Sequence, residues 1–219
     1  MALAADATLD EIRHALAPEI AAAAQFDGWS DAALLTAAEG VGLDPAVARL
    51  AFKGGAMDMI TAWVHSVDAA MQAEFADGRL DNMPTRERIR SLVMFRIERV
   101  AGLKEALRRA LAIQAMPQNV PLTLKLGWSS ADQMWRLAGD TATDYNHYTK
   151  RTILASIYAA TLAILLEDEG EDLAETRAFL DRRIENVMQF EKAKAKFLGN
   201  DREHFDVARF LGRLRYPAR

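Results

Sequence analysis

Residues 121–166 predict two long helices joined by a short turn, and this pair requires a helical body around it. The first helix carries an apolar stripe spaced by four, three, four and three residues, as one helical face requires: Leu124, Trp128, Ala131, Trp135 and Ala138. Gly139 then ends the helix, and Thr141 with Asp144 has the spacing of a capping box. We therefore predict that a second helix begins here and runs to about Leu166.

The second predicted helix changes character along its length. Its first turns place four residues on one side, because helix neighbours are three or four positions apart: Asp144, His147, Tyr148 and Arg151. Residues 152–166 then carry no charge over 15 residues, which is short of the ~20 that crossing a bilayer requires. We predict a central helix that is buried along this run.

The start of the chain predicts a helix of uncertain length. Thr8 and Glu11 have the spacing of a capping box before an apolar stripe. Pro18 lies inside this stripe, and proline removes a helical hydrogen bond. We therefore expect the first helix to break or kink at Pro18, with a short Ala-rich piece after it.

The next residues predict a helix-turn-helix unit. Ser30 caps a helix that ends at residues 40–42, and Asp44 with Pro45 supplies the N-cap and first residue of another. Glycines at residues 54 and 55 close the second helix. A helix, a tight turn and a short second helix in this order are typical of DNA-binding regulators.

Further helices are predicted over residues 56–76, from residue 84 through a bend at Gly102, and over residues 173–198. The chain is therefore predicted to be all-α. We expect three parts: a helix-turn-helix-like unit over residues 1–55, a helical body over 56–198, and a C-terminal helix over 199–219.

Charge argues against DNA as the partner of the first unit. Residues 1–82 hold 4 Lys or Arg against 13 Asp or Glu, whereas residues 83–219 hold 23 against 18. Proteins gain most of their nonspecific DNA affinity from Lys and Arg at phosphates. The second helix of the unit offers only Arg49, with Lys53 at its end. We predict no sequence-specific DNA binding, although a transcriptional regulator stays an alternative.

The C-terminal segment predicts a basic amphipathic helix over residues 201–216. Its apolar positions follow helical spacing, and its arginines lie on another side: Val207, Phe210, Leu211 and Leu214, with Arg202, Arg209 and Arg213. We predict reversible binding to a membrane surface. The alternative is an ordinary helix that docks on the body or across a dimer, because apolar periodicity does not distinguish the two.

Five blocks resemble one known family: FDGWS at residue 26, RERIRSLVMFRIE at 86, KEALRRALA at 104, GDTATDYNHYTKR at 139 and FLDRRIENVMQFEKAKA at 179. In this order they are similar to the ubiquinone-biosynthesis accessory proteins of the ninth Coq family. The resemblance covers most of residues 26–195. Lys53 and His147 depart from it, since the family usually has Pro and a larger aromatic residue there.

The resemblance implies a TetR-like, all-helical fold that binds lipid and does not catalyse a reaction. It implies that Asp144, His147, Tyr148 and Arg151 form a partner-binding surface, for which the alternative is a polar first turn that only caps the helix. It also implies that several aromatic and methionine side chains line a lipid site. The alternative for any one of them is ordinary packing in the core. The residues are Phe95, Trp128, Met134, Trp135, Tyr158 and Phe179.

The implied partners are an isoprenoid quinone or other lipid, a ubiquinone-synthesis hydroxylase or complex, and a membrane surface, with a homodimer left open. The N-terminal residues carry acids and lack the basic start of a signal or transit peptide, so we expect a bacterial cytoplasmic protein at the inner membrane. No cofactor is expected. The chain has no cysteine and four histidines that never cluster in sequence, so neither thiolate nor zinc chemistry is predicted.

Overall fold

A computed structural model describes residues 7–143, 145–170 and 172–197, apart from the side chains of residues 145 and 190–197. Over these residues the chain is helical without strands, so the predicted all-α class is confirmed. The helices are α1 (Leu9–Asp27), α2 (Asp31–Gly40), α3 (Pro45–Ala51), α4 (Ala56–Glu74), α5 (Thr85–Ala101), α6 (Lys104–Gln114), α7 (Val120–Leu137), α8 (Tyr145–Glu167) and α9 (Ala174–Phe197). The chain divides into two compact units, residues 1–181 and 182–219.

Helix α1 is continuous, so the predicted break at Pro18 is wrong, and the alternative of a kink there stays a prediction. The capping box of Thr8 and Glu11 is present at its start, and the helix passes through Pro18 to Asp27. Leu16 and Ile20 on either side of the proline are fully buried. This packing keeps both halves of the helix on the core, because most helical stability in proteins comes from burial of an apolar face.

Helices α1–α3 contact one another, and α1 also packs on α4 and α6. Ser30 caps α2 and Asp44 caps α3, as predicted. Trp29 in the turn between α1 and α2 is buried, and its indole N–H donates to the carbonyl of Ala106 on α6 at 2.9 Å. This contact joins the turn before α2 to α6, and the predicted division at residue 55 stays a prediction.

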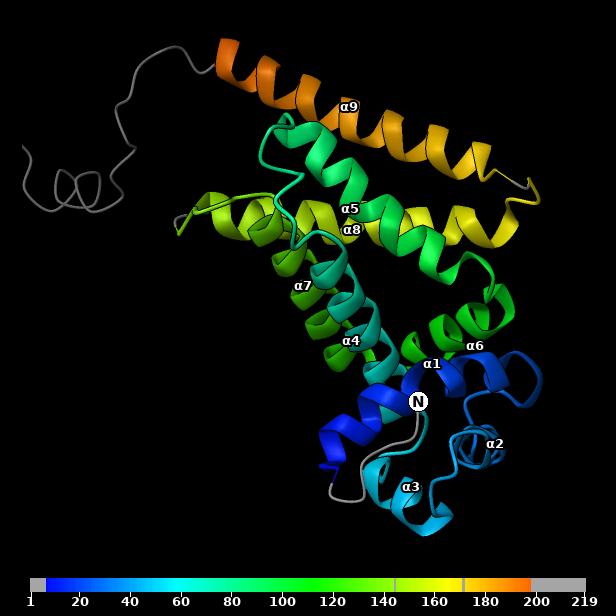
Figure 1. Ribbon diagram of the computed structural model, residues 1–219. Helices are drawn as coiled ribbons and strands as arrows, with labels where there is room; N and C mark the ends of the chain where they lie inside the picture. The colour runs from blue at the N-terminus through cyan, green and yellow to red at the C-terminus, as the bar shows by residue number, and fades with distance from the viewer. Residues whose placement is uncertain (1–6, 144, 171, 198–219) are drawn as a thin grey trace, which may run out of the picture. The chain divides into compact units, whose positions relative to one another are not determined.

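The body is built around α4, α5, α7 and α8. Helix α4 contacts α5 and α7, and α8 contacts α5, α6 and α7. Figure 1 shows α4 and α7 side by side, with α8 crossing behind α5. Helix α7 ends before Gly139, which has a φ of 84° and so stops the helix as predicted.

The buried face of α7 differs from the predicted stripe. Ala131 and Ala138 are buried, but Leu124 is 68% exposed. Ser130 is buried in place of an apolar residue, because it bonds to a charged pair inside the body. A polar member of the buried face is invisible to a pattern that counts only apolar residues.

Helix α8 is buried on one side only, which corrects the prediction of a buried central helix. Leu154, Leu162 and Leu165 are buried, whereas other uncharged positions are exposed: Thr152, Ser156, Ala159 and Ala163. Uncharged residues occur on every side of the helix between residues 152 and 166, but neighbouring helices bury only one side of it. Within the described residues, Asn146–Glu167 is long and apolar enough to span a membrane by length and composition, a test that core helices also pass.

Candidate functional site

A cavity of about 470 Å³ lies between the helices of the body. Helices α4–α8 all contribute to its wall, which is mainly aliphatic and aromatic: Ile60, Trp63, Val67, Val100, Leu107, Leu111, Leu126, Trp128, Tyr158 and Leu162. This size falls within the ~300–1,000 Å³ typical of small-molecule sites. An apolar wall of this kind suits a hydrocarbon ligand.

Two of the six residues predicted to contact lipid line this cavity, Trp128 and Tyr158. The other four lie elsewhere. Met134 is fully buried, and Phe95 packs against Phe75 with ring centroids 5.7 Å apart. Trp135 donates its indole N–H to the carbonyl of Lys150 at 3.0 Å, and Phe179 is half-buried on α9. The lipid-binding role of all six stays a prediction.

The sequence does not single out the α6 residues of the cavity wall. Leu107 and Leu111 line the cavity from α6. Their four-residue spacing indicates a packed helical face, but the same spacing occurs in any core. Nothing in the pattern shows that the neighbouring helices leave a space beside them.

One member of a buried charged pair, Arg96, lines the cavity. It is 1% exposed and makes a salt bridge to Asp68, which is also buried. Ser130 accepts from Arg96 at 3.1 Å and donates to Asp68 at 3.3 Å. The guanidinium lies 4.9 Å from the ring centroid of Tyr158. Burial disfavours the charge of Arg96, but Tyr158 and Asp68 outweigh it and raise the pKa of the guanidinium.

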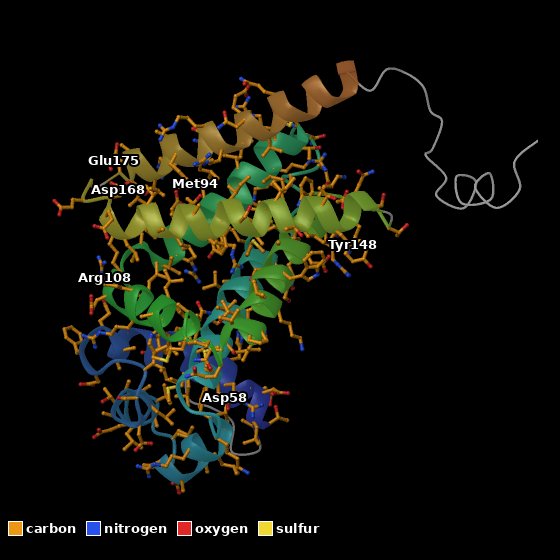
Figure 2. All side chains as sticks on the ribbon, turned by 180° about the vertical axis from the view of Figure 1, so that it is seen from behind. Asp58, Met94, Arg108, Tyr148, Asp168 and Glu175 are labelled. Carbon is orange, nitrogen blue, oxygen red and sulfur yellow. The ribbon has the colours of Figure 1, made fainter. Side chains whose placement is uncertain are left out.

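Three aromatic rings gather where α7 meets the start of α8, and we call Trp128, His147 and Tyr148 the aromatic surface. The ring centroids of Trp128 and Tyr148 are 5.8 Å apart, and those of His147 and Tyr148 are 5.1 Å apart. His147 is fixed by a contact of 2.9 Å between Nδ1 and the carbonyl of Ala142. Tyr148 is 61% exposed and lies at one end of α8, with Asp168 at the other (Figure 2).

Arg151 does not lie on this surface, contrary to its predicted place beside Tyr148. It is 2% exposed, and its Nε donates to Asp132 at 2.5 Å. Its Nη1 donates to Asp140 and to the carbonyl of His147, each at 3.1 Å. Arg151 therefore supports the aromatic surface from beneath, and its presence in a partner contact stays a prediction. Asp144 lies outside the described residues.

The carboxylates around Arg151 are held in the charged form. Burial raises the pKa of Asp132, but Arg151 and Arg136 outweigh it, so the pKa lies below its usual value. Burial likewise raises the pKa of Asp140, and hydrogen bonds from Lys150 and Arg151 bring it below the usual value. The Lys150 ammonium donates to Asp140 at 2.6 Å. These ion pairs join the end of α7 to the start of α8.

The predicted membrane-binding residues lie outside the described residues, since the structure describes nothing beyond residue 197. Among the side chains that it does describe, no group of three or more His, Asp or Glu is placed to hold a metal ion. Glu11, which lies three residues before His14, takes part in the capping box of α1 with Thr8.

The comparisons with known proteins agree with the five sequence blocks. Residues 120–191 match the family model described as COQ9. The "Ubiquinone biosynthesis protein COQ9, mitochondrial" of Rattus norvegicus is 32% identical, and that of Homo sapiens is 30% identical, each over 82% of this chain. The chain spans 59% and 58% of the length of those proteins.

A solved structure supports the fold. The TetR transcriptional regulator of Nitrosomonas europaea matches with a TM-score of 0.66 at 20% identity, over 81% of this chain and 98% of that one. Identity this low shows the fold alone. The TetR-like arrangement and the resemblance predicted from the sequence are both confirmed.

Proposed function

We propose that this chain, a relative of the COQ9 proteins, acts in ubiquinone biosynthesis as a non-catalytic accessory protein that binds an isoprenoid quinone precursor. It presents the bound lipid at a membrane to a ring hydroxylase. The COQ9 relatives are ubiquinone biosynthesis proteins, which supports this pathway. Because this chain spans less than two thirds of those proteins, its activity, ligand and partners are our proposals.

The apolar cavity is the observation that carries this proposal. Its wall suits a hydrocarbon chain, and each methylene buried from water contributes about 0.8 kcal/mol without a specific polar contact. The guanidinium of Arg96 is paired with Asp68, and among the described residues only its buried Nε lacks a hydrogen-bond partner, so the wall offers little polar capacity beyond this one N–H. A ligand that is mainly hydrocarbon therefore fits better than a polar metabolite.

The aromatic surface supports the second half of the proposal, because exposed aromatic side chains supply much of the binding energy of protein interfaces. Tyr148 is exposed, and Trp128 contacts it while also lining the cavity. A hydroxylase that docks on Tyr148 would thus lie next to the bound lipid. This placement connects ligand binding with delivery.

Lipid extracted from the purified protein and identified by mass spectrometry tests the proposal. The expected ligand is an isoprenoid quinone or its precursor at close to one molecule per chain. Gly127→Leu fills the cavity, since Gly127 lines it and a Cβ there meets nothing within 4 Å. We expect this variant to lose most of the lipid.

Gly40→Leu is the matched control, because Gly40 is also helical and open to an added side chain but does not line the cavity. It should keep the lipid. Both variants should fold at least as stably as the original, since Leu favours a helix over Gly by about 0.8 kcal/mol. Equal lipid content in both variants, or no lipid in the original protein, contradicts the proposal.

A TetR-like transcriptional regulator is the second candidate, favoured by the fold match and by the predicted caps of α2 and α3. The charges oppose it. Arg49 on α3 donates to both carboxylate oxygens of Asp31, at 3.0 and 2.8 Å, so its charge is compensated within the protein. Selection from a random DNA duplex library distinguishes the two candidates.

A further inference from the structure

Exposed apolar side chains concentrate in one short segment at the junction of α6 and α7. Met116, Val120, Leu122 and Leu124 are 44%, 39%, 38% and 68% exposed. We call these four residues the entry segment. Scattered exposed apolar residues are normal in proteins, but a cluster of this kind marks a binding surface.

The entry segment adjoins the cavity. Leu124 lines the cavity although it is the most exposed member of the segment, so the cavity reaches the molecular surface here. Thr123 on α7 and Gln114 at the end of α6 also line the cavity. Met116, Val120 and Leu122 do not line it, but they are exposed within eight residues of Leu124 in the chain.

The charge around the entry segment favours an anionic surface. Between Glu105 and Asp132 the sequence holds no acidic residue. Lys125 is exposed and makes no ion pair within the part of the chain that the structure describes. An exposed cation beside apolar side chains suits the headgroup region of a bilayer, where anionic lipids attract Lys and Arg.

We propose that the entry segment inserts into the headgroup region of an anionic lipid bilayer, so that the cavity opens directly to the membrane and takes its ligand from there. This inference rests on the proposed lipid-binding function and adds the route of entry. Membrane contact is local to the α6–α7 junction. It involves residues other than 201–216.

A fluorescent probe at Val120 tests the insertion, and the absence of cysteine from the chain allows a single label. Val120→Cys in the full chain is labelled with an environment-sensitive dye and mixed with phosphatidylcholine vesicles that contain phosphatidylglycerol. The emission should shift to the blue, and an aqueous quencher should lose access to the dye. Leu50→Cys on α3, 44% exposed in the native protein, should show neither change.

Two outcomes of the labelling experiment overturn the proposal. The first is an unchanged dye at position 120 in protein that floats with the vesicles. The second is a blue shift without vesicles that grows with protein concentration, which means that a second copy of the chain covers the segment.

A charge variant tests the same contact without a dye. Met116→Asp combined with Leu122→Asp leaves the cavity wall intact. Asp is favourable at position 122 in the first turn of α7, and Met116 lies in the connection between α6 and α7. We expect vesicle affinity to fall at least ~10-fold, because two large apolar side chains lose their burial. Leu50→Asp should change it less than about twofold. Equal loss in both variants, or none in either, contradicts a specific entry segment.

The two proposals fail separately. Mass spectrometry of the purified protein reports on the ligand whether or not vesicles bind. A dye shift at position 120 in protein that carries no lipid supports the membrane contact and rejects the proposed function. Lipid-loaded protein with an unchanged dye supports the function and rejects this route of entry.

Discussion

Arg151 stabilises the junction of α7 and α8 through contacts that only the folded chain provides. Its partners are Asp132 on α7 and Asp140 in the connection to α8, and all three side chains are largely buried. Sequence spacing places Arg151 on the same side of α8 as Tyr148. Whether that side chain is exposed depends on the residues of neighbouring segments that pack against it, and these do not follow from spacing. The same limit applies to Arg96, whose partner Asp68 lies 28 residues away.

Removing Arg151 should destabilise the protein severely. We expect Arg151→Met to lower the free energy of unfolding by about 3–5 kcal/mol, because two partly buried carboxylates lose their shared cation. Arg136→Met is the matched control, since Arg136 bonds to the same Asp132 at 2.7 Å but is 70% exposed. It should cost less than about 1 kcal/mol. Urea denaturation measures both, and equal effects contradict the assignment.

The same cluster predicts a loss of stability in acid. The pKa values of Asp132 and Asp140 are lower in the folded protein than the ordinary value of 3.8, so the unfolded chain takes up protons first as the pH falls. This stabilisation is complete well above pH 3.8 and disappears as the pH falls through the lowered values. Asp140→Asn should reduce the acid dependence of the urea midpoint, and an unchanged dependence contradicts the contribution of Asp140.

Tyr148 is the residue of the aromatic surface that a partner can reach. Tyr148→Ala should weaken co-purification with other ubiquinone-synthesis proteins, while the melting temperature stays within a few degrees because the ring is 61% exposed. Phe26→Ala removes a more exposed aromatic residue, 82% exposed, in the last turn of α1. It should leave the complex intact. Equal weakening of co-purification by both variants would contradict a specific role of Tyr148 in partner binding.

At the scale of helices, the sequence predicts most starts and stops but not which side of a helix is covered. The caps at Thr8, Ser30 and Asp44 and the stop at Gly139 are local interactions, and the structure has them where predicted. Helix α8 shows the limit. Its uncharged residues look alike in sequence, yet Leu165 is fully buried while Ala163 is exposed.

The C-terminal segment carries a prediction at this scale, although it lies outside the described residues. Its four apolar side chains could contribute roughly 3–6 kcal/mol on half burial in a bilayer, and each of its three arginines about 1 kcal/mol beside anionic lipid. This sum supports reversible binding. Truncation after Gly199 should reduce flotation with anionic liposomes, and salt should weaken binding of the full chain. Undiminished flotation of the truncated protein would assign the segment to an ordinary docked helix.

For the whole molecule, the sequence predicts the fold class and the family resemblance but not the cavity. Helical periodicity and the five blocks are properties of the chain read in order. A cavity depends on the space that five helices leave between them, with Ile60 on one side and Leu162 on another. Trp128 shows this limit, since its spacing indicates a buried stripe, whereas in the structure it lines both the cavity and the aromatic surface.

The TetR-like fold raises the question of DNA binding for the whole molecule. Fold does not determine function, and the first 82 residues carry a net charge of −9. Arg49 is already paired with Asp31, so few cations are left to neutralise phosphates. We expect selection from a random duplex library at low salt to enrich no sequence, with a TetR regulator that binds its operator as the positive control. Recovery of a defined palindromic site would instead favour the regulator, because a two-fold symmetric dimer reads such a site through paired helices.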